Sequence, residues 1–306
     1  MITPLTLCKI SELSYENEDI FKREIHNFVD NGLIDKPANI YFYNAYESTS
    51  IDAQLYIIYY KNEMIVSVRG TSSKRDIISD LYIFKKKFLD VEQINYHKKC
   101  GNYKNMKVHS GFLDQYNALK MFIISNVSNL YLNLKQDKIK IHFTSHSLGA
   151  AISVLLSTLL KSQFGDKLYI INYLFGCPKI GNNDFVNYYN NVIDETYRYV
   201  YCNDIIPRLP KINYKTTKNR IILGDPHKSN WFYRFIGNVN DHSIKYYINY
   251  LKVLEDVEYL IKGETSNSYA IKKCELNGLD NTIVREIENE NENENEKVNI
   301  DDIKIN

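Results

Sequence analysis

The residues with the clearest chemical potential are Ser145-His146-Ser147-Leu148-Gly149-Ala150. They follow an apolar, strand-like run at 139–144 and open an expected helix at 148–164. A strand–serine–helix turn is typical of a nucleophile elbow, in which a sharp turn presents a serine hydroxyl at the carboxyl edge of a sheet. Its usual pattern is G-x-S-x-G; Gly149 supplies the second glycine, and Ser145 replaces the first. A serine that merely caps a helix gives a similar pattern, so both interpretations stay open at this point.

A nucleophilic serine needs partners, because its hydroxyl is weakly reactive until an imidazole accepts its proton. In elbow enzymes an acid and then a histidine follow the serine along the chain. Asp204 comes directly after an expected strand at 197–202, and His242 follows later in Asp241-His242-Ser243. An acid at a strand end lies on the same sheet edge as the elbow. Three other residues compete for the acid or base role: His227, Asp225 and Asp241.

Strands and helices alternate around these residues. Runs rich in β-branched and aromatic residues predict strands at 54–60, 63–69, 139–144, 168–175 and 197–202. Apolar residues at helical spacing predict helices at 6–29, broken near Tyr15, and at 112–134, 148–164 and 185–192. The alternation predicts an α/β fold with a mostly parallel central sheet flanked by helices.

Composition narrows the class of protein. The 306 residues carry 38 Lys+Arg against 37 Asp+Glu, a net charge of +1 that argues against a nucleic-acid partner. A hydrophobic content of 44% is enough for a sizeable core. The five cysteines form no C-x-x-C pair, so we expect neither a disulfide framework nor a metal site, and no cofactor. We read no signal peptide or transmembrane segment, and therefore expect a cytoplasmic protein.

The end of the chain differs from the rest. Residues 288–296 alternate Glu and Asn, offer no apolar face and repel one another. The sequence therefore predicts one folded domain at 1–262 and a poorly ordered Glu/Asn-rich tail at 263–306.

Six stretches of the chain together resemble the class 3 lipases, the fungal-type triacylglycerol lipase family of the α/β-hydrolase superfamily. They occur in family order: VSVRGTSS at 66–73, VHSGF at 108–112, TSHSLGA at 144–150, FGCPKIGN at 175–182, YRYVYCNDIIPRLP at 197–210 and DHSIKY at 241–246. The departures from the family pattern are Ser145 for the first elbow glycine and Ala150 where a glycine often follows.

The resemblance implies roles for individual residues. Ser147 corresponds to the nucleophile, Asp204 to the orienting acid, and His242 to the general base and acid. The late position of His242 and its Asp-His-Ser context favour it over His227. The oxyanion hole would use the backbone N–H of Leu148 and a donor from Thr71. No metal takes part in this arrangement.

The resemblance also places a lid at 73–84, including Ser73, Ile77, Ile78 and Leu81. An amphipathic helix there would cover a hydrophobic cleft and make transient contact with a lipid surface. An ordinary surface helix packed on the core has the same pattern. Lys85-Lys86-Lys87 follows directly and would favour an anionic lipid surface, or would simply be a solvated basic run.

The sequence thus predicts a serine ester hydrolase that cleaves acylglycerols through an acyl-enzyme intermediate. Two alternatives remain open. The same triad would serve a phospholipase or a monoacylglycerol esterase, and the fold would also serve an inactive, lipase-like binding module.

Overall fold

A seven-stranded sheet organises the computed structural model, which describes residues 2–60, 63–71, 85–88, 105–133, 138–211, 213–224 and 237–263. Its strands are β1 (Asn39–Asn44), β2 (Gln54–Tyr59), β3 (Glu63–Val68), β6 (Ile139–His146), β7 (Leu168–Phe175), β8 (Glu195–Tyr201) and β9 (Arg220–Leu223), in that spatial order. The pairs β1–β2 and β2–β3 are antiparallel, and every pair from β3 to β9 is parallel. The central parallel part brings the carboxyl ends of β6, β7 and β8 to one edge.

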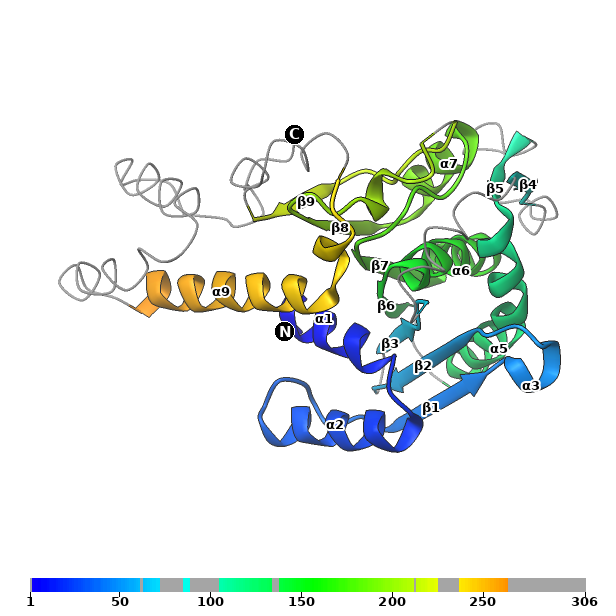
Figure 1. Cartoon of the computed structure of the whole chain (residues 1–306). Coiled ribbons are helices and arrows are strands. Elements are labelled where there is room, and N and C mark those ends of the chain that lie inside the picture. Colours follow the sequence, from blue (N-terminus) through cyan, green and yellow to red (C-terminus); the bar gives the residue numbers. More distant parts are fainter. Residues whose placement is uncertain are drawn as a thin grey trace.

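Helices cover both faces of this sheet (Figure 1). One face packs against α5 (Ser110–Asn133), α6 (Leu148–Phe164) and α7 (Asn183–Val192). The other face packs against α1 (Pro4–Leu13), α2 (Glu18–Asp30) and α9 (Ile244–Gly263). The α/β-hydrolase fold class predicted from the sequence is confirmed.

Strand β2 shows why the core has two sides. Leu55, Ile57 and Tyr59 face the core beneath α5 and α6, whereas Tyr56 and Ile58 face α1 and α2. Alternate side chains of a strand point to opposite faces, so a strand buried on both sides reads as a continuous apolar run. A smaller two-stranded ribbon, β4 (Lys85–Lys87) and β5 (Lys107–His109), lies apart from the main sheet.

The expected elements match the observed ones where apolar patterning is strong. The helices expected at 148–164 and 112–134 are α6 and α5, and the strand expected at 168–175 is β7. The helix expected at 6–29 is two helices, because Asn17 accepts the Ile20 N–H and starts α2 anew. The strands β1, β4, β5 and β9 and the helix α9 were not predicted. They are short or, in α9, mixed in polarity.

Helix α6 is the central apolar helix of the domain. The stretch Leu148–Lys167 is long and apolar enough to cross a membrane by length and composition, but 89% of it is buried inside the fold. A helix that is hydrophobic on all sides is the pattern of a core helix as well as of a membrane span. Its burial between the sheet and its neighbouring helices accounts for the composition here. The predicted division at 262/263 stays a prediction, because residues 264–306 lie outside the described part.

An ion pair between the buried Lys161 on α6 and Asp194, the residue before β8, joins these elements, and its loss should destabilise the domain. Lys161 is 3% exposed and its Nζ lies 2.7 Å from Asp194 Oδ2; it also donates to the Leu168 carbonyl. We predict that Lys161→Met lowers the free energy of unfolding by about 1.5–3 kcal/mol, because it removes the charged hydrogen bonds that the buried ammonium makes to Asp194 and to the Leu168 carbonyl.

Urea denaturation measures this loss. The control is Lys22→Met, which removes the exposed pair Lys22–Glu18 on α2 and should cost less than about 1 kcal/mol. Equal losses from the two substitutions would show that the Lys161–Asp194 pair stabilises the domain no more than an exposed pair does.

Candidate active site

Ser147 lies at a strained turn between β6 and α6. Its backbone has φ 59° and ψ −130°, a region that residues other than glycine rarely adopt. Its N–H donates to the Phe175 carbonyl at 2.9 Å, which fixes the turn against the end of β7. Ser147 holds the N-cap position of α6, yet its side chain makes no capping hydrogen bond. The geometry therefore favours the elbow interpretation over the simple helix cap.

The two residues that flank the serine explain how the turn is accommodated. A Cβ on Gly149 would lie 2.2 Å from the Val68 carbonyl oxygen, so only glycine lets α6 approach β3 this closely. Ser145, which replaces the first elbow glycine, is fully buried. Its hydroxyl lies 2.7 Å from Ser153 Oγ and accepts the Val68 N–H at 3.1 Å. The extra oxygen is thus satisfied, and the departure from the family pattern leaves the elbow intact.

Three side chains far apart in the sequence meet at this turn. The Ser147 Oγ lies 2.7 Å from His242 Nε2, and His242 Nδ1 lies 2.7 Å from Asp204 Oδ2. Ser147, Asp204 and His242 are 0%, 0% and 3% exposed. In the neutral tautomer that fits these distances, His242 Nδ1–H donates to the carboxylate and the Ser147 hydroxyl donates to Nε2.

The carboxylate of Asp204 is held by further donors. The Tyr247 hydroxyl on α9 donates to Oδ2 at 2.6 Å, and the Ile206 N–H donates to Oδ1 at 2.9 Å. Burial and the neighbouring Asp204 raise the pKa of Tyr247 well above its ordinary value, so this hydroxyl keeps its proton and stays a donor. Gly176, with φ +61°, makes room for the pair, since a Cβ there would lie 2.8 Å from His242 Cε1.

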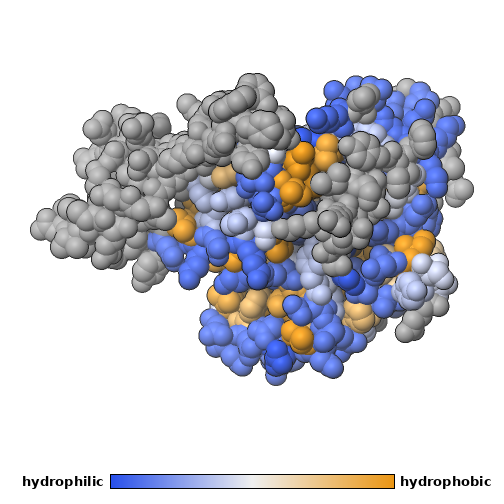
Figure 2. Space-filling view, in the orientation of Figure 1, coloured by the Kyte–Doolittle hydropathy of each residue, from blue (hydrophilic) through white to orange (hydrophobic). Residues whose placement is uncertain are grey.

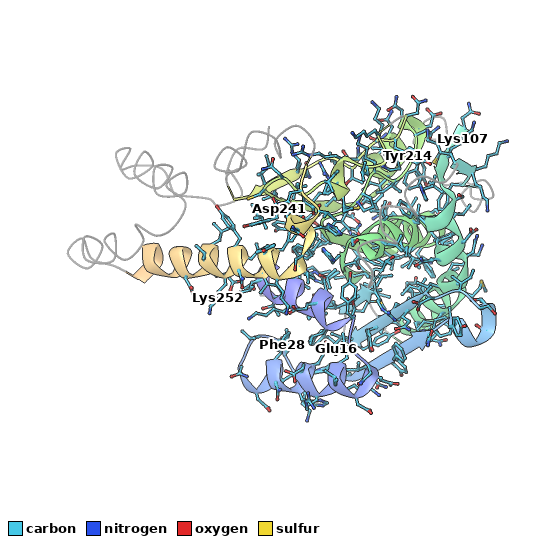
Figure 3. The ribbon with its side chains drawn as sticks, in the orientation of Figure 1. Glu16, Phe28, Lys107, Tyr214, Asp241 and Lys252 are labelled. Carbon is cyan, nitrogen blue, oxygen red and sulfur yellow. The ribbon has the colours of Figure 1, made fainter. Side chains whose placement is uncertain are left out.

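Asp241, a weaker acid candidate in the sequence, joins the two loops that carry Asp204 and His242. Its Oδ2 accepts the Asn203 N–H at 3.1 Å, and its Oδ1 accepts from Asn238 Nδ2 at 2.7 Å. Figure 3 shows Asp241 where the chain enters α9. Asp241, which precedes His242, is therefore bonded to Asn203, which precedes Asp204. The His242 ring nitrogens have Asp204 and Ser147 as their partners instead.

His146, the residue before Ser147, contacts His242 through its ring and through a hydrogen bond. The two rings stack with centroids 4.5 Å apart, and His146 Nε2 lies 2.9 Å from the His242 carbonyl oxygen. Its Nδ1 lies 3.0 Å from the Tyr15 hydroxyl. Burial, and secondarily the nearby His242, hold the pKa of His146 well below its usual range. A neutral His146 must then donate from Nε2 to the carbonyl and accept the Tyr15 hydroxyl at Nδ1.

The expected oxyanion donors lie at the start of α6 and after β3. Leu148 is the first residue of α6, where backbone N–H groups have no partner within the helix. Gly70 passes close to the elbow, because a Cβ there would lie 2.7 Å from the His146 carbonyl oxygen. Thr71 follows Gly70 and is partly buried. The oxyanion roles of Leu148 and Thr71 stay predictions.

The structure brings together some of the predicted residues and leaves others outside its described part. Ser147, Asp204 and His242 converge, and their catalytic roles stay predictions. The lid residues Ser73, Ile77, Ile78 and Leu81 lie outside the described residues, as do the competing candidates His227 and Asp225. Among the described residues, no group of three or more His, Cys, Asp and Glu could hold a metal ion. Sequence reasoning missed Tyr15, Gly176 and Tyr247, since nothing marks two tyrosines among 26.

Comparison with known proteins places this geometry in a family. The model of the family described as "Lipase (class 3)" matches residues 65–214, a stretch that contains Ser147 and Asp204. The chain belongs to the class 3 lipase family. The resemblance predicted from the sequence is thus confirmed.

Relatives of this class 3 lipase include the secreted mono- and diacylglycerol lipase 1 of Fusarium solani, which is 30% identical over 152 residues, 50% of this chain and 40% of the relative. The secreted mono- and diacylglycerol lipase MDL2 of Malassezia globosa is 29% identical over 171 residues, 54% of this chain and 53% of the relative. The chain therefore spans about half or less of these relatives. The structure of Rhizomucor miehei triacylglyceride lipase shares the fold, with a TM-score of 0.56, 21% identity, and coverage of 78% of this chain and 91% of that one.

The comparisons correct one expectation. Both the Fusarium and the Malassezia lipases are secreted proteins by name, which overturns the cytoplasmic location predicted from the sequence. That prediction rested on the lack of a recognisable leader and of a disulfide pattern, and neither observation carries a location by itself.

Crowding at Gly149 generates a prediction about the class 3 lipase elbow. Alanine is a better helix former than glycine by about 1 kcal/mol, so Gly149→Ala would stabilise an uncrowded helix. We expect destabilisation by about 1–3 kcal/mol instead, together with loss of esterase activity, because the Val68 carbonyl cannot move aside. Thermal unfolding and hydrolysis of p-nitrophenyl butyrate measure the two effects. A stabilised, active variant would contradict the crowding.

The lowered pKa of His146 generates a second prediction, about pH. Below pH ~6.5 the unfolded chain takes up a proton at this histidine and the folded chain does not, so acid favours unfolding. As the pH is lowered, we expect the free energy of unfolding to decrease more steeply for the wild type than for His146→Asn. The two slopes should differ by at most about 1.4 kcal/mol per pH unit. Urea titrations of both proteins between pH 7 and about pH 5 give the slopes. Parallel slopes would mean that His146 is not held neutral.

Proposed function

We propose that this protein hydrolyses the ester bonds of acylglycerols through an acyl-enzyme intermediate formed on Ser147. The observation that carries the proposal is the continuous hydrogen-bonded path from the Ser147 hydroxyl through His242 to Asp204, with 2.7 Å at each step. Membership of the class 3 lipase family supports the same chemistry.

In the proposed reaction His242 Nε2 accepts the Ser147 proton as the oxygen attacks the acyl carbonyl carbon. The same nitrogen then returns the proton to the departing alcohol, so the bond to the glycerol oxygen breaks and an acyl-serine remains. Water, deprotonated by His242, attacks that ester and releases the fatty acid. Asp204 fixes the tautomer and stabilises the imidazolium, helped by the donor Tyr247.

The negative charge that develops on the carbonyl oxygen would be met by the Leu148 N–H, at the positive end of α6, and by Thr71. A backbone turn that is already strained in the free enzyme needs no reorganisation when this charge forms. Loss of one oxyanion donor typically costs about 2.7–4 kcal/mol of transition-state stabilisation.

The substrate proposed is a mono-, di- or triacylglycerol. The Fusarium and Malassezia relatives are named for mono- and diacylglycerols, and we propose that this chain, like them, acts outside the cell. Hydrolysis rates on acylglycerol emulsions and on phospholipid vesicles with the same acyl chains separate this substrate class from a phospholipase. The intact path from Ser147 to Asp204 argues against an inactive binding module, which has no chemical need for it.

Substitution of the serine tests the reaction. Ser147→Ala should lower kcat for p-nitrophenyl butyrate on the order of 10⁶-fold, the loss expected when a triad serine is removed. It should also abolish covalent labelling by a fluorophosphonate. Ser162→Ala, at the other end of the same helix, where the hydroxyl donates to the Leu159 carbonyl, is the matched control and should keep its label and its activity within a few-fold. Full hydrolysis by Ser147→Ala would overturn the proposal, and an unlabelled wild type would favour the binding module.

A further inference from the structure

A group of lysines lies on four neighbouring segments of the fold. Lys85 and Lys87 are on β4, Lys107 is on β5, Lys179 follows β7, and Lys215 precedes β9. We call these five residues the lysine platform. Lys87, Lys107 and Lys215 are exposed, and Lys85 and Lys179 are half-buried.

Backbone pairing holds the four segments together. Lys87 is directly opposite Lys107 in the β4–β5 ribbon. Val108 pairs with Gly181, and Gly181 pairs in turn with Lys215, whose N–H donates to the Gly181 carbonyl at 2.8 Å. The Lys85 ammonium reaches across to the same loop, 4.4 Å from the centre of the Tyr214 ring. The lysines therefore occupy one continuous surface formed by residues distant in sequence.

The positive charges of this surface act on one another. Burial and then Lys107 lower the pKa of Lys85, and burial and then Lys215 lower the pKa of Lys179. Within the described residues, none of the five forms an ion pair with an acid; the neighbouring Lys86 pairs with Asp114 at 3.3 Å. Like charges placed directly opposite each other in a ribbon destabilise it. The repulsion between these lysines therefore costs folding free energy, and in the described part of the chain only Lys85 of the platform has a compensating contact, with the Tyr214 ring.

Protection of an exposed strand edge explains only part of this arrangement. Lysines on a short edge strand such as β4 discourage pairing with other chains. That role does not require Lys107, Lys179 or Lys215, which lie on other segments. The sequence shows the same excess, because residues 72–107 hold nine lysines and arginines against four acids, whereas the whole chain has a net charge of only +1.

One residue of the platform is close in sequence to the surroundings of the triad. Lys179 lies in the same loop as Gly176, whose Cα faces His242 and Asp204. Figure 3 places Lys107 and Tyr214 together at one corner of the molecule, and Figure 2 shows that corner as predominantly hydrophilic. Lys252, on α9, lies on the opposite side of the molecule (Figure 3).

We propose that the lysine platform is a docking surface for an anionic phospholipid bilayer, which holds the enzyme at the lipid interface where its ester substrates reside. The inference rests on the proposed function for its purpose, but the binding itself does not require catalysis. Each lysine near an anionic membrane strengthens binding roughly fivefold, so several acting together suffice for reversible attachment without a buried anchor.

Vesicle co-sedimentation tests the proposal with the full chain carrying Ser147→Ala, so that no lipid is hydrolysed. Binding is compared between vesicles of pure phosphatidylcholine and vesicles of equimolar phosphatidylcholine and phosphatidylglycerol. The platform variant is Lys87→Gln/Lys107→Gln/Lys215→Gln. We expect binding to the anionic vesicles only, with the partition coefficient lowered on the order of 100-fold in the platform variant. Salt at about 1 M, where the Debye length is about 3 Å, should abolish binding by the parent protein.

A charge-matched control separates docking from net charge. Lys36→Gln/Lys167→Gln/Lys252→Gln removes three exposed lysines elsewhere and should bind nearly as the parent does. Equal losses in both triple variants, or equal binding to neutral vesicles, would overturn the docking surface. In the active background the platform variant should hydrolyse soluble p-nitrophenyl butyrate at the wild-type rate and anionic emulsions more slowly. If the wild-type enzyme hydrolyses neither substrate, the proposed function is refuted, and the vesicle experiment still tests the docking surface separately.

Discussion

The strained backbone at Ser147 is the constraint on which the rest of the site depends. A non-glycine residue at φ 59° persists only where its surroundings hold it. Here the Phe175 carbonyl accepts the Ser147 N–H, and α6 presses so closely on β3 that position 149 has no room for a Cβ. The parallel pairing of β3, β6 and β7 brings these groups to one edge of the sheet. The sheet, Gly149 and the turn therefore act together to hold the Ser147 hydroxyl in one position.

A second constraint is the burial of the polar groups behind that hydroxyl. Buried polar groups are costly unless hydrogen-bonded, and Asp204 receives donors from His242, Tyr247 and the Ile206 backbone. The lowered pKa of His146 keeps its ring neutral, and its Nε2–H donates a hydrogen bond to the His242 carbonyl. Each residue thus limits the orientation of the next, and the His242 ring is held with Nε2 directed at Ser147. Preorganisation of this kind is what would lower the barrier of the proposed acyl transfer.

The sequence predicts the parts of this molecule that are governed by local pattern. The apolar runs gave β7 and α6 at their observed bounds, and small residues around Ser147 indicated the elbow. Asp204 and His242 could be chosen because their order and the family stretches restrict them. Tyr15, Tyr247 and the bridging role of Asp241 could not, since each depends on the packing of segments far apart in sequence. The edge strands β1 and β9 were missed because short, partly exposed strands lack a strong apolar pattern.

The site is also larger than the part of the chain that the family model matches. Residues 65–214 contain Ser147 and Asp204, but His242, Tyr247 and Tyr15 all lie outside them. The ends of the domain supply these groups, because α1 and α9 pack together on the sheet face opposite α6 through Leu5, Cys8, Ile244 and Tyr247. Tyr15 lies two residues after the end of α1, and His242 lies two residues before the start of α9. Docking of these two helices against each other therefore completes the imidazole's surroundings, and the elbow alone would present a serine without its base.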